Sequence, residues 1–227
     1  MRDKNYKTPS SSSFRIISLI LLAFTIGFSA GFFLANSLNR SMINNQQVQQ
    51  ISNRTAGNAP IPVVVDAIER AKNEPNSFEA QFTAASMYYQ IDRFEEAIKY
   101  YEAAHKLKPD DYQTIVRLGN SNYGLKRYEE ARKWYEKALQ INPNDVDVRT
   151  DYGTTFFLSE PKNLDKAIEE YQIALEKNPN HEPTLQNLCV VYREKGDKQA
   201  LKEALAKLEK INPQNPVIPR LKQEISD

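Results

Sequence analysis

The sequence contains few of the residues that build disulfides, metal sites and phosphate-binding loops. Among its 227 residues are one cysteine, two histidines and 7 glycines. A single cysteine excludes an internal disulfide and a multi-cysteine metal site. His105 and His181 have no neighbouring residues that would complete a metal site. No glycine-rich phosphate loop and no catalytic group of residues is present, so we expect no cofactor, no metal and no enzyme activity.

A concentrated basic surface is also missing. Residues 1–59 contain six basic residues and one acidic residue, a net charge of +5. Residues 60–227 contain 24 basic and 28 acidic residues, a net charge of −4. Nucleic-acid binding requires a concentrated basic face, which this acidic larger part does not offer. We therefore expect no nucleic-acid partner.

Charge is absent from one apolar run near the start of the chain. Residues 16–35 contain no charged side chain, and a helix of this length spans about 30 Å, the hydrocarbon thickness of a bilayer. The run predicts a transmembrane helix that also serves as a signal anchor. A cleaved signal peptide is the alternative, since Ser29, Ala30 and Ala35 are small enough for a cleavage site.

The basic residues before this run predict its orientation. By the positive-inside rule, residues 1–15 form a cytoplasmic tail and the larger part lies across the membrane, on the periplasmic side of a bacterial inner membrane. Residues 36–59 have no acid and few strongly apolar side chains, which predicts a flexible linker. Gly27 and Gly31 have the spacing that lets membrane helices pack closely, so a homodimer is one alternative. Glycine is common in membrane helices, so the pair is also compatible with a monomer.

Five prolines recur at nearly constant spacing in the remaining sequence. The spacings are 34, 34, 36 and 34 residues, between Pro75, Pro109, Pro143, Pro179 and Pro213. Proline ends helices and restricts the residue before it. A regular period of this length is typical of helix-turn-helix repeat arrays.

Aligned on these prolines, the sequence shows recurring apolar and small residues at helical spacing. The second unit has Leu118-Gly119, Tyr128, Ala131, Tyr135, Ala138 and Pro143. These columns resemble the tetratricopeptide repeat. The resemblance implies an all-α, right-handed helix-turn-helix solenoid of about four units with a capping helix at each end. The predicted segments are an N-terminal capping helix at 60–77, repeats at 78–111, 112–145, 146–181 and 182–215, and a C-terminal capping helix at 216–227.

Two of the units depart from the pattern. The third carries two additional residues between Ser159 and Leu164, where Pro161 requires a longer turn. The fourth has leucine at 201, 205 and 208, where the family usually has alanine, tyrosine and alanine. We expect the second helix of this unit to pack less closely. Cys189 occupies a column of small residues, which indicates a buried structural thiol rather than a nucleophile.

In tetratricopeptide repeats the first helices line the inner wall, and the resemblance assigns groove-facing positions. The predicted partner-binding residues are Phe82, Tyr89, Gln113, Val116, Asn120, Tyr123, Thr150, Thr154, Phe157, Gln186, Val190 and Arg193. Tyr89, Tyr123 and Phe157 form an aromatic row suited to a peptide with apolar side chains. Alternatively, the aromatics pack between helices and the amides are only solvated.

One class of ligand is disfavoured. Repeats that clamp the carboxylate tail of heat-shock chaperones carry lysine, asparagine and arginine on this wall. Phe82 and Ser86 replace the first two in the first unit, and Asp151 replaces arginine in the third. An aspartate at that position repels a carboxylate.

The sequence therefore predicts a non-catalytic, membrane-anchored scaffold that binds a protein or peptide client. Its architecture is similar to that of bacterial cytochrome c maturation factors, which present unfolded apocytochrome for haem attachment. That similarity implies assembly of an extracytoplasmic complex such as a c-type cytochrome. A homo-oligomerisation or complex-assembly module without peptide binding is the alternative. The identity of the client stays open.

Overall fold

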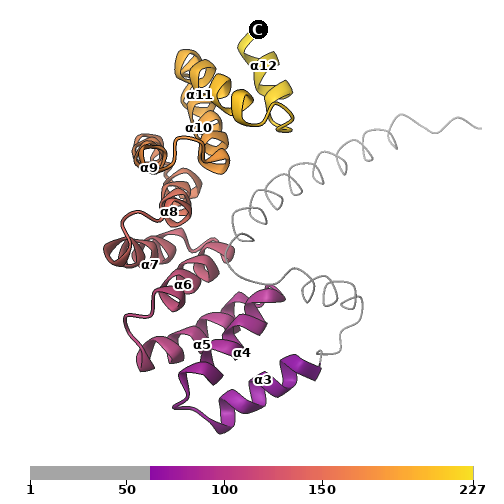
Figure 1. Cartoon of the computed structure of the whole chain (residues 1–227), viewed down its shortest axis with the longest axis vertical. Helices are drawn as coiled ribbons and strands as arrows, with labels where there is room; N and C mark the ends of the chain where they lie inside the picture. Colours follow the sequence, from indigo (N-terminus) through magenta and orange to yellow (C-terminus); the bar gives the residue numbers. More distant parts are fainter. Residues whose placement is uncertain (1–61, 227) are drawn as a thin grey trace, which may run out of the picture. The chain divides into compact units, whose positions relative to one another are not determined.

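The computed structural model describes residues 62–226, which form ten helices and no strand. Successive helices pair and stack in chain order (Figure 1). The helices are α3 (Pro62–Asn73), α4 (Phe78–Gln90), α5 (Phe94–Leu107), α6 (Tyr112–Gly124), α7 (Tyr128–Ile141), α8 (Val146–Leu158), α9 (Leu164–Lys177), α10 (Glu182–Lys195), α11 (Lys198–Ile211) and α12 (Ile218–Ser226).

The prolines lie in the short turns before the first helix of each unit, as predicted. The side chains of Ser77, Asp111 and Asp145 accept hydrogen bonds from the backbone at the starts of α4, α6 and α8. Such caps satisfy N–H groups that have no partner within the helix. In the later turns the asparagine before proline, Asn142 or Asn178, accepts from the backbone N–H two residues on. The local sequence thus ends one helix and starts the next.

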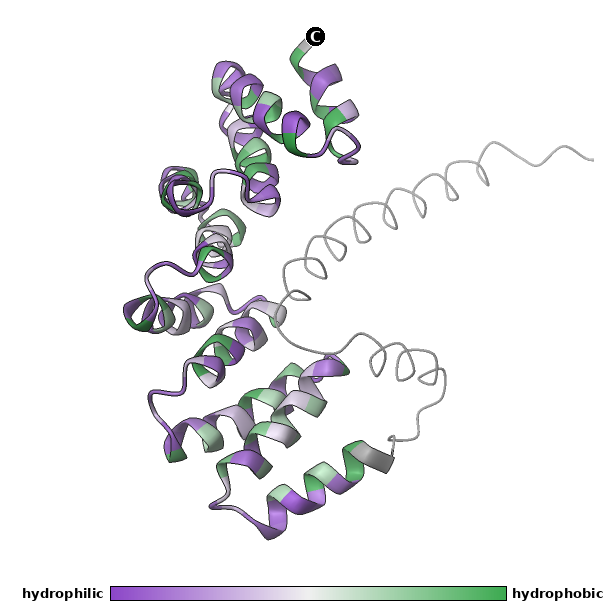
Figure 2. Cartoon of the chain, viewed as in Figure 1, coloured by the Kyte–Doolittle hydropathy of each residue, from purple (hydrophilic) through white to green (hydrophobic). Residues whose placement is uncertain are grey.

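The core lies between the helices of each unit and its neighbours. Ala131, Tyr135 and Ala138 of α7 are completely buried, and the equivalent residues of α5 and α9 are too. Gly119 of α6 allows this packing, because an added Cβ would lie 2.6 Å from Cε1 of Tyr135. Each helix mixes hydrophobic and hydrophilic residues (Figure 2), as helices with one buried face do.

The two irregular units keep the same architecture. The additional residues of the third unit lengthen the turn between α8 and α9. In α11, Leu201, Leu205 and Leu208 are all buried in one apolar cluster with Cys189. These leucines fill the space that alanine and tyrosine share in the other units. Helix α11 nevertheless meets α10 less extensively than the second helices of the other units meet their first helices, as expected.

The two end helices cover the array. Val64 and Ala71 of α3 are buried, and Ile218 and Leu221 of α12 pack into the cluster that contains α11. Within 62–226, no helix is long and apolar enough to cross a membrane. The predicted span at 16–35, with Gly27 and Gly31, lies outside the described residues.

Candidate partner-binding wall

The twelve predicted groove residues all lie in the first helices of the four units, α4, α6, α8 and α10. We call the surface that these helices form the first-helix wall. Of the twelve, Gln113 is exposed, whereas Asn120 and Thr150 are buried. The others are half-buried, which is the condition of a side chain that both packs and faces solvent.

The rings of the aromatic row (Tyr89, Tyr123 and Phe157) pack against buried neighbours and remain partly exposed on the wall. Tyr89 meets Phe94 edge-on at 5.5 Å between ring centroids, and Tyr123 meets Tyr128 in the same way at 5.6 Å. Phe157 packs against the buried cluster of the last two units. The rings therefore pack against neighbouring helices and remain half-buried, and their role in client binding stays a prediction.

The Phe82 ring packs against two other aromatic rings. It stacks on Phe78 at 5.7 Å and meets Tyr101 edge-on at 5.5 Å. Val116 packs against the buried cluster of the second unit, and both Val116 and Val190 are half-buried.

Cations of the chain cover two members of the row. The Arg117 guanidinium lies 5.2 Å from the centre of the Tyr89 ring, and the Lys162 ammonium lies 5.3 Å from the centre of the Phe157 ring. Lys162 also bonds to Glu194 at 2.5 Å. Cation–ring contacts of this kind are attractive by about 0.5–1 kcal/mol at exposed sites.

The hydroxyl groups near the centre of the wall resist ionisation. Burial raises the pKa of Tyr123, and the negative charge of Asp151 raises it further. Burial also raises the pKa of Tyr89, with Arg117 acting in the opposite direction. The Tyr89 hydroxyl is buried and has no hydrogen-bond partner among the described residues. These phenols therefore stay neutral and can serve only as hydrogen-bonding groups.

Three polar residues of the wall form hydrogen bonds with buried tyrosines. The Tyr135 hydroxyl donates to Oδ1 of Asn120 at 2.8 Å. Because the hydroxyls of Ser86 and Thr154 already donate to backbone oxygens, they accept from the second-helix tyrosines of their own units. Those contacts are Tyr101 to Ser86 at 3.1 Å and Tyr171 to Thr154 at 2.9 Å. This recurring bond was missed, although its signal, a polar residue paired with a tyrosine in three units, was present.

A second polar group joins α8 to α10, and we call it the polar seam. Thr150 and Thr184 share a hydrogen bond of 2.6 Å, and His181 lies 3.0 Å from Asp147 through Nε2 and 2.6 Å from Thr184 through Nδ1. Asn187 adds a bond to Thr154 at 3.2 Å. Thr150 was predicted to face a client, but its hydroxyl lies within this seam.

Two further wall residues have partners near the C-terminal end of the array. Gln186 accepts from the Asn215 amide at 3.0 Å, and Arg193 lies 3.7 Å from Glu224 of α12. Both side chains therefore help to hold the C-terminal helix against the array.

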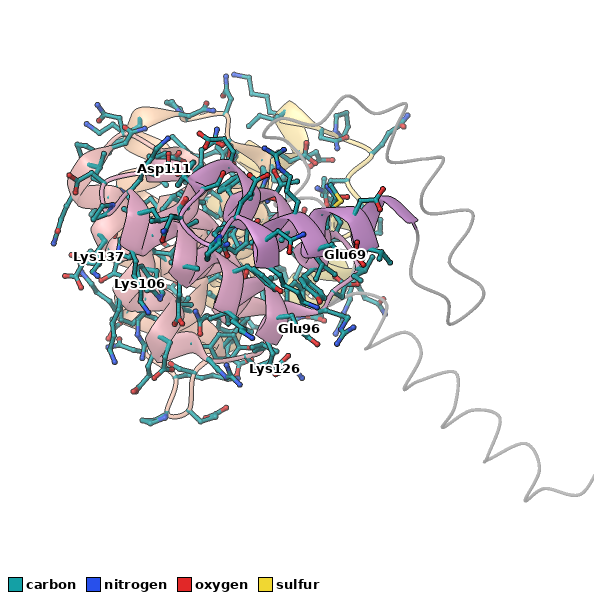
Figure 3. The ribbon with its side chains drawn as sticks, turned by 90° about the horizontal axis from the view of Figure 1, so that it is seen from below. Glu69, Glu96, Lys106, Asp111, Lys126 and Lys137 are labelled. Atoms are coloured by element: carbon teal, nitrogen blue, oxygen red, sulfur yellow. The ribbon has the colours of Figure 1, made fainter. Side chains whose placement is uncertain are left out.

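The side chains that could act as nucleophiles or metal ligands are buried or lie away from the wall. Burial raises the pKa of the Cys189 thiol to about 12, so it is not a thiolate nucleophile at neutral pH. Trp134 meets His105 edge-on at 5.1 Å and borders an open hollow on α7 of about 500 Å³. Figure 3 shows Lys106 and Lys137 pointing outward on the same side of the view. The described residues contain no group of three potential metal ligands.

The geometry of helix pairs, proline turns and alanine–tyrosine packing can now be compared with known proteins. Residues 78–111 and 113–145 match the family model of the tetratricopeptide repeat. The first two units are therefore similar to tetratricopeptide repeats. A search of curated proteins found no match.

Solved tetratricopeptide-repeat structures have the same fold. YrrB, described as a tetratricopeptide-repeat protein with an unusual peptide-binding site, is 21% identical with a TM-score of 0.62, over 70% of this chain and 81% of its own. MamA from Desulfovibrio magneticus is 20% identical with a TM-score of 0.64, over 76% and 94%. TTC0263 from Thermus thermophilus is 17% identical with a TM-score of 0.53, over 72% and 87%. At these identities the likeness concerns the fold alone.

Proposed function

We propose that this protein is a non-catalytic scaffold that binds an extended segment of a protein client on its first-helix wall. The observation that supports this most is the row of half-buried aromatic rings at Tyr89, Tyr123 and Phe157, one in each of three consecutive repeats. Rings that already pack on one side lose little conformational entropy when a client covers the other. YrrB, whose fold is similar, has a peptide-binding site, and this precedent also favours the proposal.

The test compares the aromatic row with equivalent rings elsewhere. Tyr89→Ala combined with Tyr123→Ala in the full chain should reduce client capture at least tenfold, measured by crosslinking and quantitative mass spectrometry. Tyr100→Ala with Trp134→Ala is the matched control, since both rings are half-buried on second helices, away from the first-helix wall. Circular dichroism verifies that both pairs remain helical. Equal capture by the two double variants would refute the assignment of the wall.

We also propose that residues 16–35 anchor the scaffold in a bacterial inner membrane, with the repeats on the periplasmic side. The uncharged length and the basic residues before it support this placement. In intact spheroplasts, added protease should then remove the repeats and leave residues 1–15 protected. Protection of the repeats, or their release by alkaline carbonate, would contradict the anchor or its orientation.

Presentation of apocytochrome c is the narrower form of this proposal. Its support is the similarity of architecture, one anchor followed by helical repeats. A peptide that contains the haem-attachment sequence Cys-x-x-Cys-His should bind the full chain in fluorescence anisotropy, and binding should weaken in the Tyr89 and Tyr123 variant. If the same peptide binds no better than its scrambled form, the cytochrome role is wrong while the scaffold proposal stands.

A further inference from the structure

The third unit joins its two helices by a different turn from the other units. The other three units use short turns, at 91–93, 125–127 and 196–197. Each of these contains one residue with positive φ, namely Asp92, Lys126 and Gly196. The turn from α8 to α9 is longer, at 159–163, and none of its residues has positive φ. The third unit therefore has a longer and differently folded turn where its first helix ends, beside Phe157.

Lys162 lies in this turn and contacts two neighbouring first helices. Its ammonium lies 5.3 Å from the centre of the Phe157 ring, at the end of α8. It also donates to Oε1 of Glu194, in the last turn of α10, at 2.5 Å. The turn is fixed at its end, because the backbone N–H of Asn163 donates to the backbone oxygen of Phe156 at 2.9 Å. Lys162 thus lies over the third ring of the aromatic row.

The ammonium covers the part of the Phe157 ring that a client would contact. Phe157 packs against the buried apolar cluster of the last two units. The side chain of Lys162 is 35% exposed, so its charged end does not lie within that cluster. It must therefore lie on the side of the ring that faces solvent, and the ring cannot also receive an apolar client side chain there.

The contacts of Lys162 are weak because they are partly exposed. The Lys162 and Glu194 side chains are 35% and 37% exposed. Ion pairs at such exposure contribute little, because water and salt screen them. A cation over a partly exposed ring adds a similarly small attraction. The Arg149–Glu170 pair, with side chains 15% and 5% exposed, would in contrast be costly to break. The cover on Phe157 can therefore be displaced.

We propose that Lys162 is a removable cover on the third ring of the first-helix wall, which an apolar side chain of the client must displace in order to bind. This inference rests on the proposed function, since it concerns how the same wall is closed and opened. In the free chain, Lys162 bridges the Phe157 ring and Glu194. In the bound chain, the ammonium turns away from the ring and the client side chain takes its place. The cover thus rejects segments that gain little from the ring.

The experiment compares the parent chain with a variant that lacks the cover. Random twelve-residue peptides without charged side chains, displayed on phage, are panned against full-length Lys162→Ala in detergent micelles. Selected peptides are then measured by fluorescence anisotropy. The matched control is Lys195→Ala, because Lys195 forms an ion pair of 2.6 Å with Asp165 between the same two units. Lys195 takes part in none of the cation–ring contacts within residues 62–226. Each variant is first compared with the parent chain in helicity and Tm.

A selected peptide should bind Lys162→Ala about fivefold more tightly than it binds the parent chain, a gain of about 1 kcal/mol. Lys195→Ala should bind it as the parent chain does. Adding Phe157→Ala should remove the gain, because Lys162 then has no ring to cover. Salt at about 1 M should bring the parent chain closer to Lys162→Ala, since it screens the pair with Glu194 and leaves the uncharged peptide unaffected.

The other results separate this inference from the proposed function. If the peptides require the rings of Tyr89 and Tyr123 but bind Lys162→Ala and the parent chain equally, the cover is wrong and the scaffold proposal stands. The same conclusion follows if Lys195→Ala gains as much affinity, or if the gain persists without the Phe157 ring. If the peptides bind the Tyr89→Ala, Tyr123→Ala variant as tightly as the parent chain, both proposals are wrong.

Discussion

The second and the fourth repeats have the same backbone arrangement with different side chains in the core. In the second, Gly119 lies against the Tyr135 ring, and the Tyr135 hydroxyl donates to Asn120. In the fourth, the corresponding residues are Cys189, Leu205 and Val190, none of which carries a hydroxyl, and Cys189 and Leu205 belong to one buried apolar cluster. The packing of the two helices in a unit therefore depends on how well side chains fill the space between them. The hydrogen bond to a polar acceptor is needed only where a tyrosine places its hydroxyl in that space.

The family model matches residues 78–111 and 113–145. It matches neither the third unit, which keeps alanine, tyrosine and alanine at 167, 171 and 174, nor the fourth, which does not. The fourth unit replaces tyrosine and its polar acceptor together, so neither group is left unsatisfied. Repeats can therefore diverge in sequence without changing the fold when residues that contact one another are replaced together.

The largest effect is expected from moving one residue of the fourth repeat into the second. Gly119→Cys should lower the free energy of unfolding by about 3 kcal/mol, because the new Cβ overlaps the buried Tyr135 ring. Urea denaturation followed by circular dichroism measures the loss. The reverse change, Cys189→Gly, should cost about 2 kcal/mol through an added cavity and a helix-weakening glycine. A fully stable Gly119→Cys would show that the two cores are interchangeable residue by residue.

A smaller effect is expected from removing the recurring hydroxyl bond. Tyr135→Phe should lower the free energy of unfolding by about 1.5 kcal/mol, because it leaves the buried Asn120 oxygen without its donor. Combining it with Asn120→Val, the type of residue found in the fourth repeat, should recover about 1 kcal/mol. A double-mutant cycle in urea measures the coupling. Strict additivity of the two changes would mean that the bond contributes nothing.

The smallest effect concerns His105 in the first repeat. Burial, assisted by the charge of Lys137, lowers the pKa of this imidazole in the folded chain. The unfolded chain therefore binds the proton more readily, so stability is complete above about pH 6.5, the ordinary histidine value, and declines as the pH falls below it. His105→Gln should reduce this decline in Tm measured between pH 7 and pH 5. An unchanged pH profile would show that His105 titrates alike in both states.

The period of the prolines predicts the helix pairs because it depends on local backbone chemistry. Each proline ends a helix through its own ring and missing N–H, and the following cap starts the next helix. The fold is therefore predicted from short stretches of sequence. The burial of all three leucines of α11 in one apolar cluster is less easily predicted, because column identity says little about how well different side chains fill the same volume.

The wall was predicted less well, because the direction of a polar side chain depends on partners distant in sequence. Asn120 and Thr154 lie on the expected helices, but tyrosines 15 and 17 residues later engage their oxygens. Thr150 is held by Thr184, 34 residues away. Repeat position specifies a helix face, and only tertiary packing decides whether a group on that face is free for a client.

The polar seam between α8 and α10 has a mechanical consequence. Hydrogen bonds weaken steeply when their angle or length changes, whereas apolar side chains can shift past one another with little loss. The joint between the third and fourth units, held through Thr150, Thr184 and His181, is therefore stiff.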